Sequence, residues 1–132
     1  MLVIKNTKIY TSAGVVHEKG DILIKNGKIE KVGGSIEADA EIIDGEGLVT
    51  MPGFVDAHNH AACNMLERAK QDLNEMSNNS TPQMDILYSV DFNSKDFKFY
   101  YNGGVTTSGI IPGSGNVVGG IGCTVKGWGE SH

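Results

Sequence analysis

Apolar and polar residues alternate over short stretches of the first 50 residues, which is typical of β-strands. The clearest case is GDILIKNGKIEKVG, residues 20–33, where the alternation runs on both sides of Asn26 and Gly27. Asn-Gly accepts the positive φ values of a type I′ turn, so this stretch predicts a β-hairpin. Further short strands are expected at LVIKN, at TKIYTS and on both sides of Asp44-Gly45.

The pattern changes after Pro52. GFVDAHNH, residues 53–60, predicts a strand, and GVTTSGIIP predicts another that closes at Pro112. Between them, SKDFKFYYNGG predicts a short helix that Ser94 caps and Gly103 ends. Strand, helix and strand in this order indicate a βαβ unit over residues 53–111.

Two more elements complete the pattern. In residues 64–76, apolar residues at a spacing of three and four predict a helix; they are Leu66, Ala69, Leu73 and Met76. CTVKGW, residues 123–128, predicts one more strand. The segment between residues 103 and 129 holds ten of the chain's 18 glycines, which indicates a local loop system.

Composition then limits the class of partner. The chain has 132 residues and a net charge of −5, and acidic residues outnumber basic ones in both halves. We therefore expect no nucleic-acid partner and no membrane partner. The start carries Lys5 and Lys8 without a long apolar core, so it does not resemble a secretory signal. Cys63 and Cys123 are expected to be thiols, and the protein to be cytoplasmic.

The candidate chemistry lies in PGFVDAHNH, residues 52–60. Side chains of a strand repeat their direction every two residues, so His58 and His60 project from one face, with Cα atoms about 6.6 Å apart. Two imidazoles at that separation can converge on one divalent ion such as zinc. Asp56 shares the face; it can accept a ring N–H from a ligating histidine or contact the metal environment directly. The alternative is an exposed His-x-His pair without a function.

This stretch resembles the first metal-binding motif of the amidohydrolase superfamily, PG-(F/L/I)-(I/V)-D-x-H-x-H. GKIEKVG and IIDGEGLVTMPGF resemble the segment that precedes the motif in that family. GVTTSGIIPGSGNVVGGIGCTVKGWG and, more loosely, DLNEMSNNSTPQMDILYSVDF resemble a branch related to imidazolonepropionase. The resemblance covers essentially the whole chain.

The resemblance implies a fold of mixed α/β class with a β-rich N-terminus. Residues 1–51 would be part of a β-sandwich, and residues 52–132 the first strands and helices of an incomplete TIM barrel. It also implies that His58 and His60 are metal ligands and that Asp56 belongs to the catalytic site. The metal would be one or two divalent ions, commonly zinc, and the substrate a small amide or cyclic amide whose C–N bond is hydrolysed.

The chain is short for this assignment. A TIM barrel needs about 250 residues, and a catalytic zinc needs three protein ligands. The only other histidines, His17 and His132, match no ligand of the family. We therefore expect the sequence to be an N-terminal part of such an enzyme, inactive by itself, and a homo-oligomer or self-associating because its apolar faces lack cover.

Two rival interpretations stay open. One is a small binding module with a structural zinc held by His58, His60, Cys63 and Cys123, although H-x-H-x-x-C is not a standard zinc-finger spacing. The other is a ligand loop in the glycine-rich GSGNVVGG, whose glycines follow GxGxxxG rather than a dinucleotide or P-loop pattern. Structural turns explain the same glycines equally well.

Overall fold

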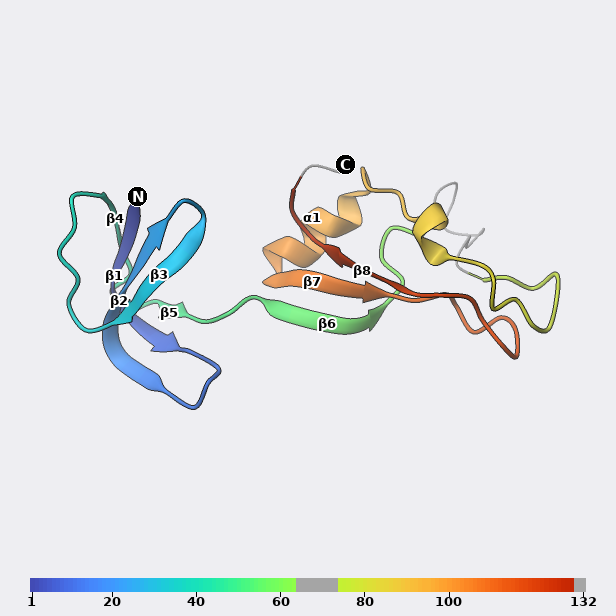
Figure 1. Cartoon of the computed structure of the whole chain (residues 1–132), viewed down its shortest axis with the longest axis horizontal. Coiled ribbons are helices and arrows are strands. Elements are labelled where there is room, and N and C mark those ends of the chain that lie inside the picture. The colour runs from blue at the N-terminus through green and yellow to red at the C-terminus, as the bar shows by residue number, and fades with distance from the viewer. Residues whose placement is uncertain (64–73, 130–132) are drawn as a thin grey trace. The chain divides into compact units, whose positions relative to one another are not determined.

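The computed structural model describes residues 1–63 and 74–129. The chain divides into two compact units, Met1–Pro52 and Gly53–His132, called unit 1 and unit 2 below (Figure 1). Their assignment to a sandwich segment and a barrel segment stays a prediction. The helix expected over residues 64–76 falls mainly on residues 64–73, which lie outside the described residues.

Unit 1 is built around one five-stranded sheet. Its strands are β1 (Leu2–Tyr10), β2 (Val16–Lys25), β3 (Lys28–Gly33), β4 (Glu41–Asp44) and β5 (Val49–Thr50). The order is β3-β2-β1-β4, and β5 also pairs with β1. β1 runs antiparallel to β2 and parallel to β4 and β5. The β-rich N-terminus expected from the sequence is confirmed.

The hairpin between β2 and β3 forms where the sequence predicts it. Lys25 pairs with Lys28, and the two residues between them have positive φ values of 52° at Asn26 and 71° at Gly27. Both central residues of a type I′ turn require positive φ, which asparagine and glycine tolerate best. This local rule therefore fixes the register of the hairpin.

The two strands expected at LVIKN and TKIYTS are one strand, β1, with an irregularity in its middle. The register against β2 shifts between Ile4 and Thr7, and Asn6 has a φ of 60°. The Asn6 main-chain N–H donates to Asp21 Oδ1 at 3.0 Å instead of to the ladder. A β-bulge thus bends a continuous strand, and the expectation of two separate strands was wrong.

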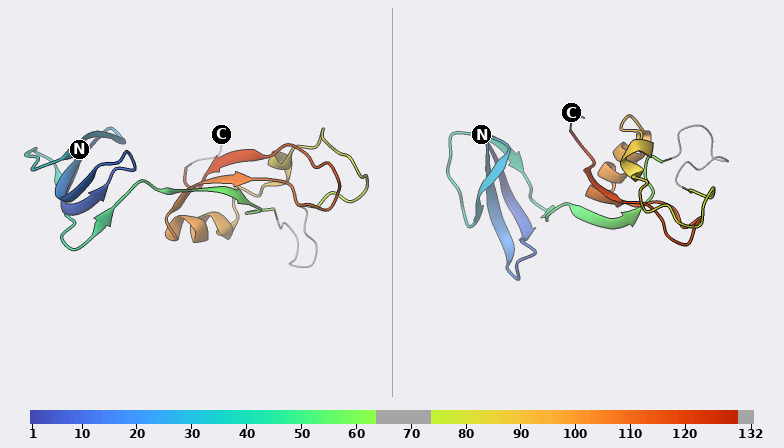
Figure 2. Two further views of the ribbon diagram at one scale, coloured as in Figure 1. Left: turned by 90° about the horizontal axis from the view of Figure 1, so that it is seen from below. Right: turned by 45° about the vertical axis from the view of Figure 1, so that its right-hand side comes forward.

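Unit 2 contains a three-stranded sheet with one helix. Its elements are β6 (Phe54–Asn59), the 3₁₀-helix η1 (Ile86–Ser89), α1 (Lys95–Asn102), β7 (Val105–Ile110) and β8 (Cys123–Lys126). β6 and β7 are parallel neighbours, which confirms the predicted βαβ unit. α1 lies against β7 on one face of this sheet (Figure 2).

The ends of α1 also follow the sequence prediction. Ser94 caps the helix, because its hydroxyl accepts the Asp96 main-chain N–H at 3.2 Å. At the other end, the Gly103 N–H donates to Tyr100 O at 3.0 Å, and the left-handed φ of 86° falls on Gly104. The helix therefore stops at Gly103, as predicted.

The strand predicted at residues 123–128 is β8, but its direction differs from that of a barrel strand. β8 runs antiparallel to β7, with Ser108 opposite Val125. Successive strands of a TIM barrel are parallel. Residues 111–122 instead return the chain directly alongside β7, as in a hairpin. The described residues are β-rich with few helices, and the TIM barrel stays a prediction.

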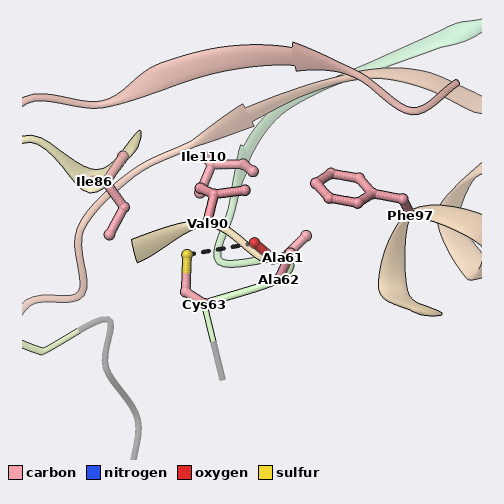
Figure 3. Packing of buried hydrophobic residues seen from close by; sticks show 7 residues of the cluster. All are labelled: Ala61, Ala62, Cys63, Ile86, Val90, Phe97 and Ile110. Atoms are coloured by element: carbon pink, nitrogen blue, oxygen red, sulfur yellow. Dashed lines mark hydrogen bonds between the residues drawn. The ribbon is translucent and has the colours of Figure 1, made fainter. Parts of the chain in front are cut away.

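The core of unit 2 lies between η1, α1 and the sheet (Figure 3). The seven buried residues of this cluster are Ala61, Ala62, Cys63, Ile86, Val90, Phe97 and Ile110. Three of them directly follow the His-x-His motif, so the segment that leaves β6 is anchored in the core. Within the described ranges, no helix is long and apolar enough to cross a membrane.

Candidate metal centre

The D-x-H-x-H motif lies at the carboxyl end of β6, where this edge strand leaves the sheet. Asn59 is the last residue of β6 and pairs with Ile110 of β7. The two strands approach closely at Gly109, where a Cβ atom would lie 2.6 Å from the Ala57 carbonyl oxygen. The carboxyl ends of parallel strands are where α/β proteins place their binding groups.

His58 and His60 approach each other edge to face. Their ring centroids are 5.4 Å apart and the ring planes make an angle of 84°. His58 is exposed and His60 is half-buried. The strand itself ends at Asn59, so the approach of the His60 ring depends on the turn that follows β6 and not on strand alternation alone.

The His60 ring is oriented by a main-chain group of another segment. Its Nδ1 lies 2.8 Å from the carbonyl oxygen of Ile111. A carbonyl oxygen only accepts hydrogen bonds, so Nδ1 carries the proton and the lone pair of the neutral ring is on Nε2. The Ile111 N–H in turn donates to the Asn59 carbonyl at 3.1 Å. Such a contact on the remote nitrogen fixes the tautomer of a metal-ligating histidine.

Asp56 is held by two donors. Its Oδ1 accepts the His58 main-chain N–H at 3.2 Å, and its Oδ2 accepts Asn59 Nδ2 at 3.0 Å. The Asn59 amide, and then the His58 N–H, hold the pKa of Asp56 below its usual range. The carboxylate therefore stays ionised at neutral pH. Among the described residues it bonds to the backbone of the motif and to Asn59, and to neither imidazole ring.

The pair lacks further protein ligands within the described ranges. No group of three or more His, Cys, Asp or Glu side chains gathers there in a way that could hold a metal ion. A catalytic zinc has three protein ligands and an open position. His58 and His60 therefore supply two converging imidazoles, and a complete centre would need ligands in addition to them.

The same observation weakens the structural-zinc interpretation. The Cys63 thiol is buried in the core and donates to the Ala61 carbonyl at 3.4 Å (Figure 3). Cys123 is half-buried, and burial raises the pKa of its thiol, which disfavours the thiolate that zinc requires. The structure does not gather these two sulfurs and the two histidines into one group.

The glycine-rich segment has a structural use. Its main chain bonds to residues 79–86: Thr81 N–H donates to Val118 O at 2.9 Å, and Ile121 N–H donates to Met84 O at 2.7 Å. A Cβ atom on Gly120 would collide with the Met84 carbonyl. These glycines allow two backbones to approach each other, which favours the structural-turn interpretation over a phosphate loop.

Sequence reasoning missed two residues that hold the motif. Asn59 stands between the two histidines, but nothing in the pattern indicates that its side chain turns back to Asp56. Asp96 accepts the Ala62 N–H at 2.9 Å from the first turn of α1. This contact joins residues 34 positions apart, so no local pattern could have revealed it.

Comparisons with known proteins agree with the resemblance of the motif. No protein-family model matches the chain. It is 38% identical to amidohydrolase tasK of Hapsidospora irregularis in an alignment 117 positions long that covers 81% of this chain. Over 59 residues it is 49% identical to a dihydroorotase of Elusimicrobium minutum. Over 79 residues it is 40% identical to a 5-methylthioadenosine/S-adenosylhomocysteine deaminase of Caldicellulosiruptor saccharolyticus.

A solved structure matches almost the whole chain. The crystal structure of an amidohydrolase from Thermotoga maritima MSB8 superposes with a TM-score of 0.88 and 37% sequence identity, over 98% of this chain. The chain spans 34% of that structure. It spans 12% of tasK, 14% of the dihydroorotase and 18% of the deaminase.

Proposed function

Because this chain belongs to the amidohydrolase superfamily, we propose that it supplies the first two metal ligands, His58 and His60, of a hydrolase that acts on C–N bonds. The observation that carries the proposal is the edge-to-face pair of imidazoles with centroids 5.4 Å apart. The tautomer that Ile111 imposes on His60 supports it, because Nε2 is then the free donor atom. The substrate would be a small amide or cyclic amide.

The donor set fits a divalent ion of the zinc type, since neutral imidazoles are common zinc ligands. Such an ion, when bound, lowers the pKa of a coordinated water to about 7 and polarises a carbonyl group. In this proposal Asp56 positions the main chain of His58 and has no direct role as a ligand.

The remaining ligands and the group that moves the proton would come from the part of the enzyme that this chain does not span. We propose that the 132-residue chain alone therefore hydrolyses no amide or cyclic amide above background, with zinc or manganese added. The groups that activate the water and those that position it act together. Losing several of these groups therefore lowers the activity by orders of magnitude. Measurable turnover by the purified chain would contradict this.

Zinc titration by calorimetry tests the metal role directly. Two ligands predict weak binding, with a Kd of about 1 μM or higher. His58→Ala and His60→Ala should each abolish it. His17→Ala is the matched control, because it removes a half-buried histidine of unit 1 and should leave the Kd unchanged. Binding that survives both single substitutions would refute the role of the motif, and nanomolar affinity would favour a structural zinc.

We further propose that the chain self-associates and that its compartment is the cytoplasm. The support for association is the edge strand β6, where the apolar side chains of Phe54 and Val55 are 56% and 67% exposed. Exposed apolar edge strands pair with other chains. Light scattering should report particles larger than 14.1 kDa, and a monodisperse monomer would count against association.

A further inference from the structure

The side chain of Asn59 links the two ends of the D-x-H-x-H motif. Its Oδ1 accepts the Ala61 main-chain N–H at 3.1 Å, and its Nδ2 donates to Asp56 Oδ2 at 3.0 Å. Asn59 is only 7% exposed, so both polar atoms of the carboxamide are used inside the protein. The bond partners also fix which atom is which, because an N–H needs an acceptor and a carboxylate needs a donor.

No other side chain of this size makes both bonds. An aspartate at position 59 keeps an acceptor for Ala61 but places a second carboxylate beside Asp56. A leucine or an alanine keeps neither bond. The two bonds of Asn59 bracket both histidines, because Asp56 also accepts the His58 N–H and Ala61 directly follows His60. The Asn59 carboxamide therefore links the residues on either side of the two histidines.

A second anchor lies on the far side of His60. Ala62 has a φ of 60°, a left-handed conformation that alanine rarely adopts. Its N–H donates to Asp96 Oδ2 at 2.9 Å, and its carbonyl accepts the Asp91 N–H at 2.8 Å. Both main-chain groups of this turn are thus held by the segment around the start of α1.

We propose that Asn59 and Asp96 are positioning residues that set the two imidazoles of the motif in their converging geometry. The recorded hydrogen bonds of both side chains go to other groups than the imidazole rings, so each acts through the main chain that carries the rings. The placement of the two rings is a property of the metal-free protein. The effect on metal affinity rests on the proposed function of His58 and His60.

The test compares Asn59→Ala and Asp96→Ala with two matched controls in unit 2. Asn116→Ala removes an asparagine whose Nδ2 donates to Thr81 Oγ1, and Asp85→Ala removes a carboxylate that caps η1. Asp96→Asn is the conservative variant, since its amide oxygen can still accept the Ala62 N–H.

Two quantities are measured in each variant. Nuclear magnetic resonance of the metal-free chain at pH 8 gives the ring-to-ring contacts of His58 and His60 and the tautomer of His60. Calorimetry with zinc alone gives the Kd. Asn59→Ala and Asp96→Ala should lose the ring contacts and the single tautomer, and should raise the Kd about tenfold or more. The controls and Asp96→Asn should keep the contacts, with a Kd within about threefold of the parent. A residue that only stabilises the fold would lower the melting temperature without changing the rings.

The outcomes separate this inference from the proposed function. Unchanged ring contacts and tautomer in Asn59→Ala and Asp96→Ala would overturn the inference, even if zinc binds through the histidines. If zinc binding survives His58→Ala and His60→Ala, the proposed function fails, and the ring contacts still decide the inference. Where the alanine variants do not fold, Asn59→Asp replaces them, because it keeps the Ala61 bond and removes the donor to Asp56. Parent-like rings in that variant would also overturn the inference.

Discussion

Units 1 and 2 each contain an aspartate held in the same way, but its surroundings differ. Asp44 in unit 1 and Asp56 in unit 2 both accept the main-chain N–H two residues ahead and the side-chain amide of an asparagine. Asp44 ends β4, the short strand that pairs with β1. Asp56 lies in β6, and the turn that follows β6 is held by hydrogen bonds to residues far away in the sequence. The same two kinds of hydrogen bond thus lie at the end of a sheet strand in one unit, where the asparagine is 38 positions away, and inside the candidate site in the other, where it is 3 positions away.

The comparison teaches where geometry comes from in each unit. The hairpin of unit 1 follows from Asn26 and Gly27, a rule that acts over four residues. The site of unit 2 depends on Ile111 and Asp96, which lie 51 and 34 positions from the residues they hold. Substitutions at chosen positions in each unit test this contrast.

The largest effect is expected from Gly109→Ala in unit 2. The added Cβ would lie 2.6 Å from the Ala57 carbonyl, so β6 and β7 must separate next to His58. Overpacking of this kind lowers the free energy of unfolding by about 1–3 kcal/mol. Trp128, the only tryptophan, stacks on Tyr101 with ring centroids 5.3 Å apart. Its fluorescence therefore follows the unfolding of unit 2 in urea.

Gly119→Ala is the control for that substitution. The nearest atoms to its new Cβ would be 3.7 and 3.9 Å away, which is ordinary contact. Its unfolding midpoint should stay close to that of the parent. Equal midpoints for the two alanine variants would show that the close approach of β6 and β7 does not limit the stability of unit 2.

The next effect is expected from Gly27→Ala in unit 1. Alanine at a φ of 71° is strained by about 1–2 kcal/mol. Hydrogen exchange of the β2 and β3 amides should accelerate, because the turn that sets their register becomes unfavourable. Lys28→Ala, on the exposed side of the same turn, should leave exchange unchanged. If the hydrogen exchange of the β6 and β7 amides accelerated as much, the effect of the turn would not be confined to the hairpin of unit 1.

In both units, what could be predicted from the sequence depends on how far along the chain the determining residues lie. The type I′ turn and the Ser94 cap could be predicted because each depends on neighbouring residues. The bulge at Asn6 could not, since its N–H is diverted to Asp21, which lies 15 positions away. The direction of β8 was equally hidden, because it depends on the return of the chain alongside β7 over residues 111–122.

The sequence pointed to the residues of the candidate site but not to the hydrogen bonds that hold them. The spacing of Asp56, His58 and His60 predicted a metal site, and that assignment stays a prediction. The backbone contacts of Asn59 and Asp96 depend on a turn with a left-handed alanine, which no propensity favours. Zinc binding itself stays a prediction for the calorimetric test.

A moderate effect is expected from Ser94→Ala, which removes the cap of α1. The Asp96 N–H would lose its acceptor at 3.2 Å, and loss of such a cap lowers the free energy of unfolding by about 1 kcal/mol. Trp128 fluorescence during urea unfolding measures the change in unit 2. Ser94→Asp should restore most of it, since aspartate caps as well as serine. A parent-like midpoint for Ser94→Ala would mean that Asp96 is held by its bond to Ala62 and not by the cap.

The smallest effect is expected from the pH dependence of unit 1. The Asn6 side chain, and then the Glu46 N–H, hold the pKa of Asp44 below its usual range. A carboxyl group whose folded pKa is lowered adds stability above its unfolded pKa of about 3.9, and this stability is lost as the pH falls through the folded value. Asp44→Asn should therefore destabilise unit 1 at pH 6 and match the parent more closely near pH 3.

The methyl signals of Ile22, a buried residue of unit 1, give the urea midpoint of this unit at each pH. Glu46→Gln is the control, because it removes a neighbouring exposed carboxylate and leaves the Asp44 bonds in place. Asp44 is exposed to solvent, so the shift should be small and should shrink further in high salt. A difference between Asp44→Asn and the parent that stays constant from pH 6 to pH 3 would mean that ionisation of Asp44 contributes nothing. The common geometry of Asp44 and Asp56 would then be a matter of turn shape alone.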